Sequence, residues 1–199
     1  MRKLFLKVNA EKSKVVRPPK STFLGFTFWK SKDGWRCRPA DDRKQRLRDK
    51  VKKILLRKEA IARKLGDTVR LLNWPVGGWI NYYSLGSMKN FLEEFGMWMR
   101  HKVRVVIMKQ WKKPKTVYRN LKKLNAYLRS GFTDEQIFAV ANTRLGLYRR
   151  CGMITANVLI SRKIMEQKNP AEQRPALLDP VRIYYRQRAK LYEKYASVM

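Results

Sequence analysis

Residues 41–65 read DDRKQRLRDKVKKILLRKEAIARKL, a stretch in which apolar residues return every three to four positions. This spacing predicts one long amphipathic helix whose remaining surface is largely basic. Asp41 and Asp42 favour a helix start at this point, because the N-terminal end of a helix carries partial positive charge. Gly66 is the predicted end of the helix. The apolar positions are Leu47, Val51, Ile54, Leu55, Ile61, Ala62 and Leu65.

Further helical segments follow this one along the chain. The segment LLNWPVGGWINYYS at 71–84 contains Pro75 and two glycines, which predict a bent or interrupted helix that packs closely on its neighbours. Pro114 ends the next apolar-periodic stretch, and the residues from Thr133 to Gln136 form a capping-box pattern. The later helices are predicted at 88–112, at 117–128, from Thr133, within 155–167, and from Asp179 and Pro180 onward.

Ahead of the helices, residues 23–37 read FLGFTFWKSKDGWRC and predict a two-stranded β-hairpin that Pro39 ends. Gly34 suits the turn, because glycine readily adopts a positive φ. Residues 4–16 alternate weakly and predict a strand or a short helix end, then a turn and a strand. A lone hairpin is marginally stable in water, so we expect its apolar face to be covered by the helices or to remain exposed as a docking edge.

The chain is strongly basic. It has 47 Lys and Arg against 15 Asp and Glu, a formal net charge of +32 over 199 residues. Such a charge favours a polyanionic partner, and nucleic acid is the leading one because cations that meet phosphates release condensed counterions. An anionic membrane is disfavoured, because Gly, Pro and Asn interrupt the longest uncharged runs. No secretory signal is recognised at the start, which predicts a cytoplasmic protein.

Few residues suggest catalysis. The single His101 lies between two basic residues, and Cys37 and Cys151 are far apart without nearby histidine. Neither a metal site nor a cofactor site is therefore predicted. The Asp41 and Asp42 pair resembles polymerase metal ligands only superficially, and helix capping is the preferred interpretation. Whether the chain is an enzyme stays open at this point.

Basic residues on the predicted helices are the candidate nucleic-acid contacts, through phosphate oxygens. A solvated surface charge is the alternative for each of them. Four aromatic residues, Trp74, Trp79, Tyr82 and Tyr83, are suited to stacking on exposed bases, but their helical spacing beside a glycine pair favours core packing. The candidate phosphate contacts are Lys50, Lys53, Arg57, Arg100, Lys102, Arg104, Lys109 and Lys112.

The order of several motifs resembles the C-terminal part of group II intron-encoded reverse transcriptases. The segments LKVNAEKSKVV, RPPKST and FLGFTF resemble the end of the family's palm. The segments RLRDKVKKILL, LLNWPVGGWINYYS and FGMWMRHKVR resemble the three helices of the thumb, also called the maturase-specific domain. The segments KQWKKPKTVYRNLKKL and ANTRLGLYRR resemble the continuation beyond the thumb.

This resemblance implies a mainly α fold, with a β-hairpin remnant of the palm followed by a basic helical thumb bundle and further C-terminal helices. It implies four parts: a palm-derived strand and hairpin at 1–39, the thumb at 40–114, a helical continuation at 115–168, and a linker with a C-terminal helix at 169–199. Within the first part, Phe23, Leu24 and Gly25 match the turn that cradles the primer end.

The functional implication is binding of intron RNA, or of a template-primer duplex, in support of splicing or reverse transcription. Nothing in the chain matches the fingers or the Tyr-Ala-Asp-Asp metal site, which would precede residue 1, so no catalytic residue is carried over. Cys and His clusters of an HNH-type endonuclease are not found in the sequence either. Two alternatives stay open: a subunit of a split reverse transcriptase completed by a separate fingers and palm chain, and an unrelated basic RNA-binding structural protein.

Overall fold

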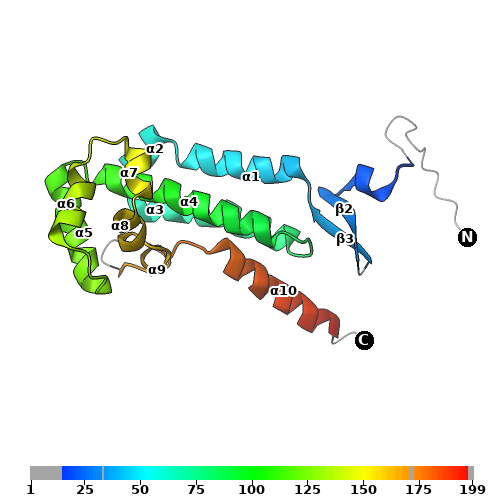
Figure 1. Ribbon diagram of the computed structural model, residues 1–199. Helices are drawn as coiled ribbons and strands as arrows, with labels where there is room; N and C mark the ends of the chain where they lie inside the picture. Colours follow the sequence, from blue (N-terminus) through cyan, green and yellow to red (C-terminus); the bar gives the residue numbers. More distant parts are fainter. Residues whose placement is uncertain (1–14, 33, 171–172, 197–199) are drawn as a thin grey trace, which may run out of the picture.

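The computed structural model describes residues 15–32, 34–170 and 173–196. A small antiparallel sheet near the N-terminus is followed by helices, which confirms the predicted mainly α class (Figure 1). The elements expected at 4–16 fall almost wholly on residues 1–14, outside the described residues. The elements are η1 Pro18–Lys20, β1 Thr22–Phe23, β2 Phe26–Ser31, β3 Gly34–Pro39, α1 Asp41–Ile54, α2 Arg57–Ala62, α3 Leu65–Tyr83, α4 Lys89–Gln110, α5 Pro114–Leu128, α6 Asp134–Asn142, α7 Leu147–Gly152, α8 Ile154–Leu159, α9 Arg162–Met165 and α10 Pro180–Ala196.

The sheet has three strands in the order β1-β2-β3, rather than the two expected. Leu24 and Gly25 both have positive φ, at 51° and 82°, and they reverse the chain between β1 and β2. The stretch FLGFTFW is therefore not one strand, because its first residues form a turn of their own. The predicted pairing of the following segments is confirmed, with Phe28 opposite Cys37 and Gly34 at a φ of 119°.

Contacts with the end of α3 hold the sheet on the helices. The Tyr82 hydroxyl donates to the Leu24 carbonyl at 3.1 Å, and the Ser87 amide, which follows α3, donates to the Cys37 carbonyl at 2.8 Å. The ring of Phe26 lies edge-on to the ring of Tyr83, with centroids 5.0 Å apart. Helical residues thus cover the sheet at Phe26, whereas Phe23, Leu24 and Trp35 stay exposed, so each of the two expectations holds for a part of the sheet.

The predicted single helix over residues 41–65 is wrong, because the chain breaks between α1 and α2 at Leu55 and Leu56. The break lets Ala60 bury completely, and the side-chain amide of Gln110 donates to the Ala60 carbonyl at 3.3 Å. These tertiary contacts outweigh a sequence pattern that continues as helix. Gly66 does not end a helix either, since it is the second residue of α3.

The acidic start of α1 is where the sequence places it, but it does not cap the helix by hydrogen bonds. Ala40 is the N-cap residue, and no side chain caps the helix. Asp41 instead accepts from the Lys44 ammonium at 2.8 Å, and this hydrogen bond lowers the pKa of Asp41. Asp42 pairs with Arg43 at 3.2 Å. The carboxylates therefore act through the helix dipole and through local ion pairs.

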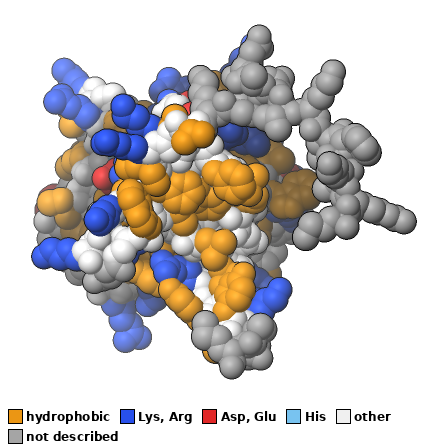
Figure 2. All heavy atoms as spheres, turned by 90° about the vertical axis from the view of Figure 1, so that its right-hand side faces the viewer, with side chains coloured by type: hydrophobic (Ala, Val, Ile, Leu, Met, Phe, Trp, Pro, Cys, Tyr) orange, Lys and Arg blue, Asp and Glu red, His pale blue; other side chains and the backbone are white. Residues whose placement is uncertain are grey.

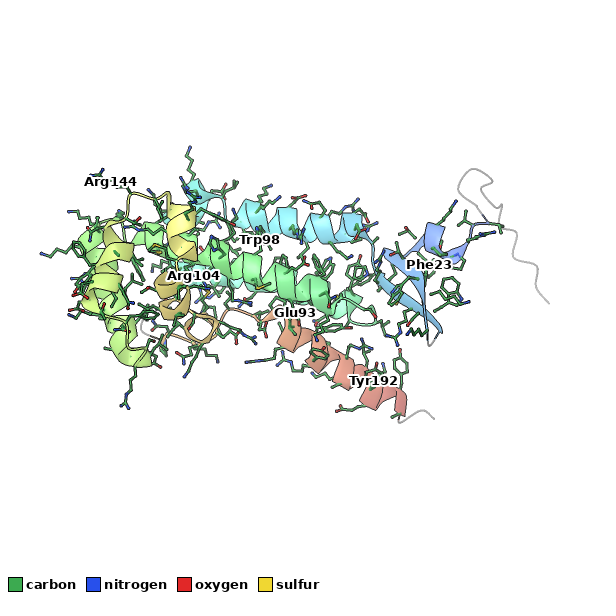
Figure 3. All side chains as sticks on the ribbon, in the orientation of Figure 1. Phe23, Glu93, Trp98, Arg104, Arg144 and Tyr192 are labelled. Carbon is green, nitrogen blue, oxygen red and sulfur yellow. The ribbon has the colours of Figure 1, made fainter. Side chains whose placement is uncertain are left out.

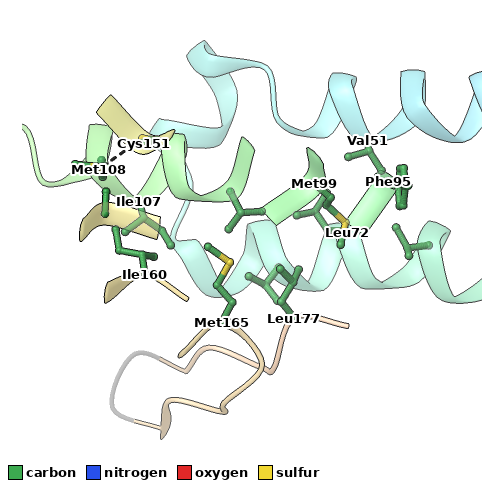
Figure 4. Close-up of a cluster of buried hydrophobic side chains, with 14 of the residues drawn as sticks. Val51, Leu72, Phe95, Met99, Ile107, Met108, Cys151, Ile160, Met165 and Leu177 are labelled. Carbon is green, nitrogen blue, oxygen red and sulfur yellow. Dashed lines mark hydrogen bonds between the residues drawn. The ribbon is translucent and has the colours of Figure 1, made fainter. Parts of the chain in front are cut away.

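Helices α3 and α4 form the centre of the core, with α1 and α10 packed against them (Figures 1 and 4). Helix α3 runs through Pro75 without the expected interruption. Proline has no backbone N–H, so the helix loses one hydrogen bond at Pro75. Complete burial of Leu72 and Ile80 on the inner face of the helix offsets this loss. Helix α4 lies within two residues of its predicted bounds.

The C-terminal part folds back along α3 and α4. Helices α5 and α6 pack together, and the predicted capping box at Thr133 and Gln136 is present. The helix expected within 155–167 is divided into α8 and α9, and α7 precedes them. Asp179 caps α10 as predicted, since its carboxylate accepts from the Arg182 amide at 3.2 Å. Asn73 of α3 anchors the segment before α10 by donating to the Ala176 carbonyl at 2.8 Å.

Candidate nucleic-acid interface

A basic hollow of about 380 Å³ lies where α1 gives way to α2, facing α4 and α7. Three of the predicted contact residues line it together: Arg57 from α2, and Lys102 and Lys109 from α4. Lys52 of α1 and Tyr148 of α7 complete its polar rim, and leucine, isoleucine and valine side chains form its floor. No carboxylate belongs to this lining within the described part of the chain. We call this feature the basic hollow.

The rim of the basic hollow is partly pre-arranged. The Lys102 ammonium lies over the ring of Tyr148, 5.0 Å from its centroid, in a cation–π contact. Lys52 is held near Asp49 at 3.4 Å, so part of its charge is already balanced. For Arg57 and Lys109, the described residues contain no carboxylate at ion-pair distance. Arg57 and Lys109 can therefore donate hydrogen bonds to the oxygens of an anion at the rim.

Three further predicted contacts are exposed and lie outside the hollow. Lys50 and Lys53 belong to the outer side of α1, and Lys112 follows the end of α4. Their placement is compatible with phosphate contact but does not bring them into the hollow.

Arg104 and Arg100 correct the prediction. Arg104 is only 5% exposed and donates to the carbonyls of Ile160 and Cys151 at 3.2 and 3.3 Å (Figure 3). Arg100 is mostly covered and lies 3.9 Å from the buried carboxylate of Asp179. Burial lowers the pKa of both arginines. Their side chains join α4 to the C-terminal segments, so neither is available to a phosphate.

A second basic surface lies on α5, where the sequence analysis predicted no contact residue. A shallow basin of about 570 Å³ runs along this helix beside Tyr118. Helical spacing of the cations in KKPKTVYRNLKKL is the signal that would have found it. Among the basic residues of this basin, Lys122 forms an ion pair with Asp134 at 2.6 Å, and that hydrogen bond raises the pKa of Lys122. The basic residues of the basin are Lys113, Lys115, Arg119, Lys122 and Lys123.

The aromatic residues of α3 divide into two pairs. Tyr83 is buried and Trp79 is partly covered, as core packing requires. Trp74 is 85% exposed and Tyr82 is 55% exposed, so the core interpretation is wrong for these two. The failure arises because helical spacing identifies a face but not whether another element covers it. Trp74 presents its ring to solvent, whereas Tyr82 is partly committed to the sheet: its hydroxyl donates to the Leu24 carbonyl at 3.1 Å, and its ring stacks on that of Phe26 with centroids 6.1 Å apart.

The turn that resembles the primer-cradling motif joins β1 to β2 and lies against the end of α3. Phe23 and Leu24 are each 65% exposed, and Figure 3 labels Phe23 on the sheet. Gly25 is buried instead, and a Cβ built on it would lie 2.5 Å from the hydroxyl of Tyr83. The glycine is thus required for the close approach of sheet and helix, while Phe23 and Leu24 face outward.

The remaining reactive groups are structural. Burial raises the pKa of the Cys151 thiol to about 12, and its sulfur lies 3.2 Å from the sulfur of Met108 (Figure 4). Burial also lowers the pKa of His101, whose ring lies 4.1 Å from that of Tyr148. In the described portion, no three His, Cys, Asp or Glu residues gather as metal ligands would. None of the helices there has the length and apolar character needed to span a membrane.

Cys151 is expected to resist alkylation in the native protein. Because the thiolate is the nucleophile, a thiol with a pKa of about 12 stays protonated and unreactive at pH 8. Iodoacetamide followed by mass spectrometry should label the partly exposed Cys37 and leave Cys151 unmodified until denaturant is added. The Cys37→Ser variant should then give no native labelling, and rapid labelling of Cys151 in that variant would contradict its burial.

The family model of the group II intron, maturase-specific domain, matches residues 44–127. This range runs from the first turn of α1 into the last turn of α5. It contains Arg57, Lys102 and Lys109 of the basic hollow, and all five cations of the α5 basin. This match supports a maturase thumb region at residues 44–127, as the resemblance indicated. No curated protein matches the chain.

Proposed function

We propose that the chain acts in group II intron splicing or reverse transcription by binding structured intron RNA, or a template-primer duplex, through its phosphates. The match to the maturase-specific domain supports the splicing role. The observation that carries the proposal is the basic hollow. It brings Arg57, Lys102 and Lys109 together from two helices, without a carboxylate among the described lining residues, and inside the matched domain.

The physical case rests on charge that the protein does not balance internally. The net charge of +32 makes the folded chain repel itself, and binding a polyanion relieves that repulsion. Arg57 offers a planar fork suited to two phosphate oxygens, whereas the lysines act as point charges. The α5 basin adds a second row of cations, which suits a partner longer than a single phosphate.

A competition experiment separates a maturase from a general RNA binder. Labelled group II intron RNA is bound to the protein and challenged with an excess of unrelated structured RNA of equal length. A maturase should keep a marked preference for the intron. Equal displacement by both RNAs would favour the alternative of a basic structural protein that binds RNA without selecting it.

The exposed side of the sheet favours a second candidate, a subunit of a split reverse transcriptase. Phe23, Leu24 and Trp35 are exposed apolar residues on a small sheet, and such residues suit contact with another polypeptide. Under this proposal, mixing with a fingers and palm chain should restore primer extension. If a fused version extends primers while the mixture stays inactive, the split-enzyme proposal is wrong.

A further inference from the structure

A second hollow, of about 390 Å³, lies between the sheet, the start of α4 and α10. Its volume is within the roughly 300–1,000 Å³ of ligand pockets. Figure 2 looks toward this end of the molecule, where hydrophobic side chains gather across the face with Lys and Arg side chains around them. The polar and aromatic residues that matter for the argument are Trp29, Arg38, Lys44, Lys89, Tyr185 and Arg188.

Arg188 is held in place by two tyrosines rather than by an acid. One end of its guanidinium donates to the hydroxyl of Tyr184 at 2.6 Å, and the other end donates to the hydroxyl of Tyr192. The same group lies over both rings, 5.5 and 5.4 Å from their centroids. Tyr184 is itself buried and donates to the Gly86 carbonyl at 3.0 Å. The guanidinium is therefore fixed, while its remaining N–H groups are unused by the described residues.

The second hollow keeps a net positive charge when nearby carboxylates are included. Four cations line it, and no carboxylate does so within the described part of the chain. Asp41 lies 2.8 Å from Lys44, and Glu93 lies 3.9 Å from Lys89, so two of the four have a nearby counterion. Arg38 and Arg188 have no carboxylate at ion-pair distance among the described residues. The two tyrosine contacts favour the charged guanidinium of Arg188, and a bound anion would supply the counterion that the described residues do not.

Two exposed rings accompany this charge. Trp29 on β2 is 37% exposed, and Tyr185 on α10 is 50% exposed, although both line the hollow. A phosphate alone would make no use of them, and bases inside a duplex are already stacked on each other. We propose that the hollow binds one unpaired nucleotide of an RNA strand, with its phosphate on Arg188 and its base stacked on Trp29 or Tyr185. This inference rests on the proposed RNA-binding function and adds single-stranded RNA to it.

The test compares two labelled RNAs by fluorescence anisotropy: a blunt duplex, and the same duplex with a short single-stranded extension. The wild-type protein should bind the extended duplex more tightly by roughly tenfold, the order expected for a base stacked on an aromatic ring. The Trp29→Ala/Tyr185→Ala variant should lose that gain and keep its affinity for the blunt duplex. The matched control, Trp35→Ala/Tyr195→Ala, removes two exposed rings outside the hollow and should keep the gain.

The outcomes separate a failure of the proposed nucleotide site from a failure of the proposed RNA-binding function. If the wild-type protein binds neither RNA, the proposed function and the site are both wrong. If it binds both RNAs equally, or if the Trp29 and Tyr185 variant keeps the full gain, only the site is wrong. Displacement of the extended strand by polyglutamate as readily as by unlabelled RNA would show an acidic-peptide site instead.

A second measurement does not depend on any variant. With 4-thiouridine placed in the extension, ultraviolet crosslinking followed by mass spectrometry should identify peptides containing β2 or α10. Crosslinks confined to other segments would overturn the proposal.

Discussion

Neutralising the basic hollow should lower the affinity for structured RNA by about a hundredfold near physiological salt. The variant is Arg57→Gln, Lys102→Gln and Lys109→Gln together, which removes the three predicted contacts that the fold assembles. The estimate assumes one phosphate contact for each residue, because each such contact releases its share of condensed counterions. Filter binding or anisotropy over a range of salt concentrations measures the change.

A matched control separates the effect of the basic hollow from the effect of total charge. Lys30→Gln, Lys168→Gln and Lys190→Gln remove the same formal charge from three exposed positions outside the basic hollow. This control should weaken binding far less than the hollow variant and leave the salt slope nearly unchanged. Equal losses in the two variants would mean that the RNA responds to net charge and that the hollow has no special role.

Two glycines of the same helix should respond oppositely to alanine. A Cβ on Gly66 would lie 2.8 Å from the backbone carbonyl oxygen of Gln173, so the segment leading to α10 must move. We expect Gly66→Ala to lower the free energy of unfolding by about 1–3 kcal/mol, as overpacking does. A Cβ on Gly78 meets nothing within 4 Å, so Gly78→Ala should raise stability by about 0.5–1 kcal/mol through helix propensity.

Denaturant unfolding of the two alanine variants gives both values, and Gly78→Ala is the control for the effect of glycine removal itself. The two substitutions are expected to change the free energy of unfolding in opposite directions. A general preference of α3 for alanine would raise it in both variants and so cannot produce this result. An increase in stability for both variants would show that the segment around Gln173 does not pack on α3 as described.

Periodic helices bounded by strong local signals could be predicted from sequence. Helix α4 follows its apolar spacing, and the capping box starts α6. Helix α5 ends at its predicted Leu128 but begins at Pro114, ahead of the predicted start at 117, because proline is favoured in the first turn of a helix. The break at Leu55 and Leu56 could not be predicted, because both residues continue the helical pattern. It depends on Ala60 and Gln110, whose contact joins residues 50 positions apart in the chain.

The same limit explains the mixed outcome for the candidate contacts on α4. Lys102 and Lys109 line an open hollow, whereas Arg100 and Arg104 lie under segments that return from later in the chain. Sequence spacing places all four on one helix but does not reveal which side those segments cover. Trp74 is the opposite case. Its helical spacing predicted core packing, but no described element covers it, and it is exposed.

The most direct test of the central claim is the salt dependence of wild-type binding to labelled group II intron RNA, with unrelated structured RNA in excess. A plot of log affinity against log salt should fall steeply, with a slope of several units, since each phosphate contact contributes roughly 0.7–0.9. The preference for the intron should persist across the range. A slope near zero, or binding that the unrelated RNA removes completely, would contradict the account.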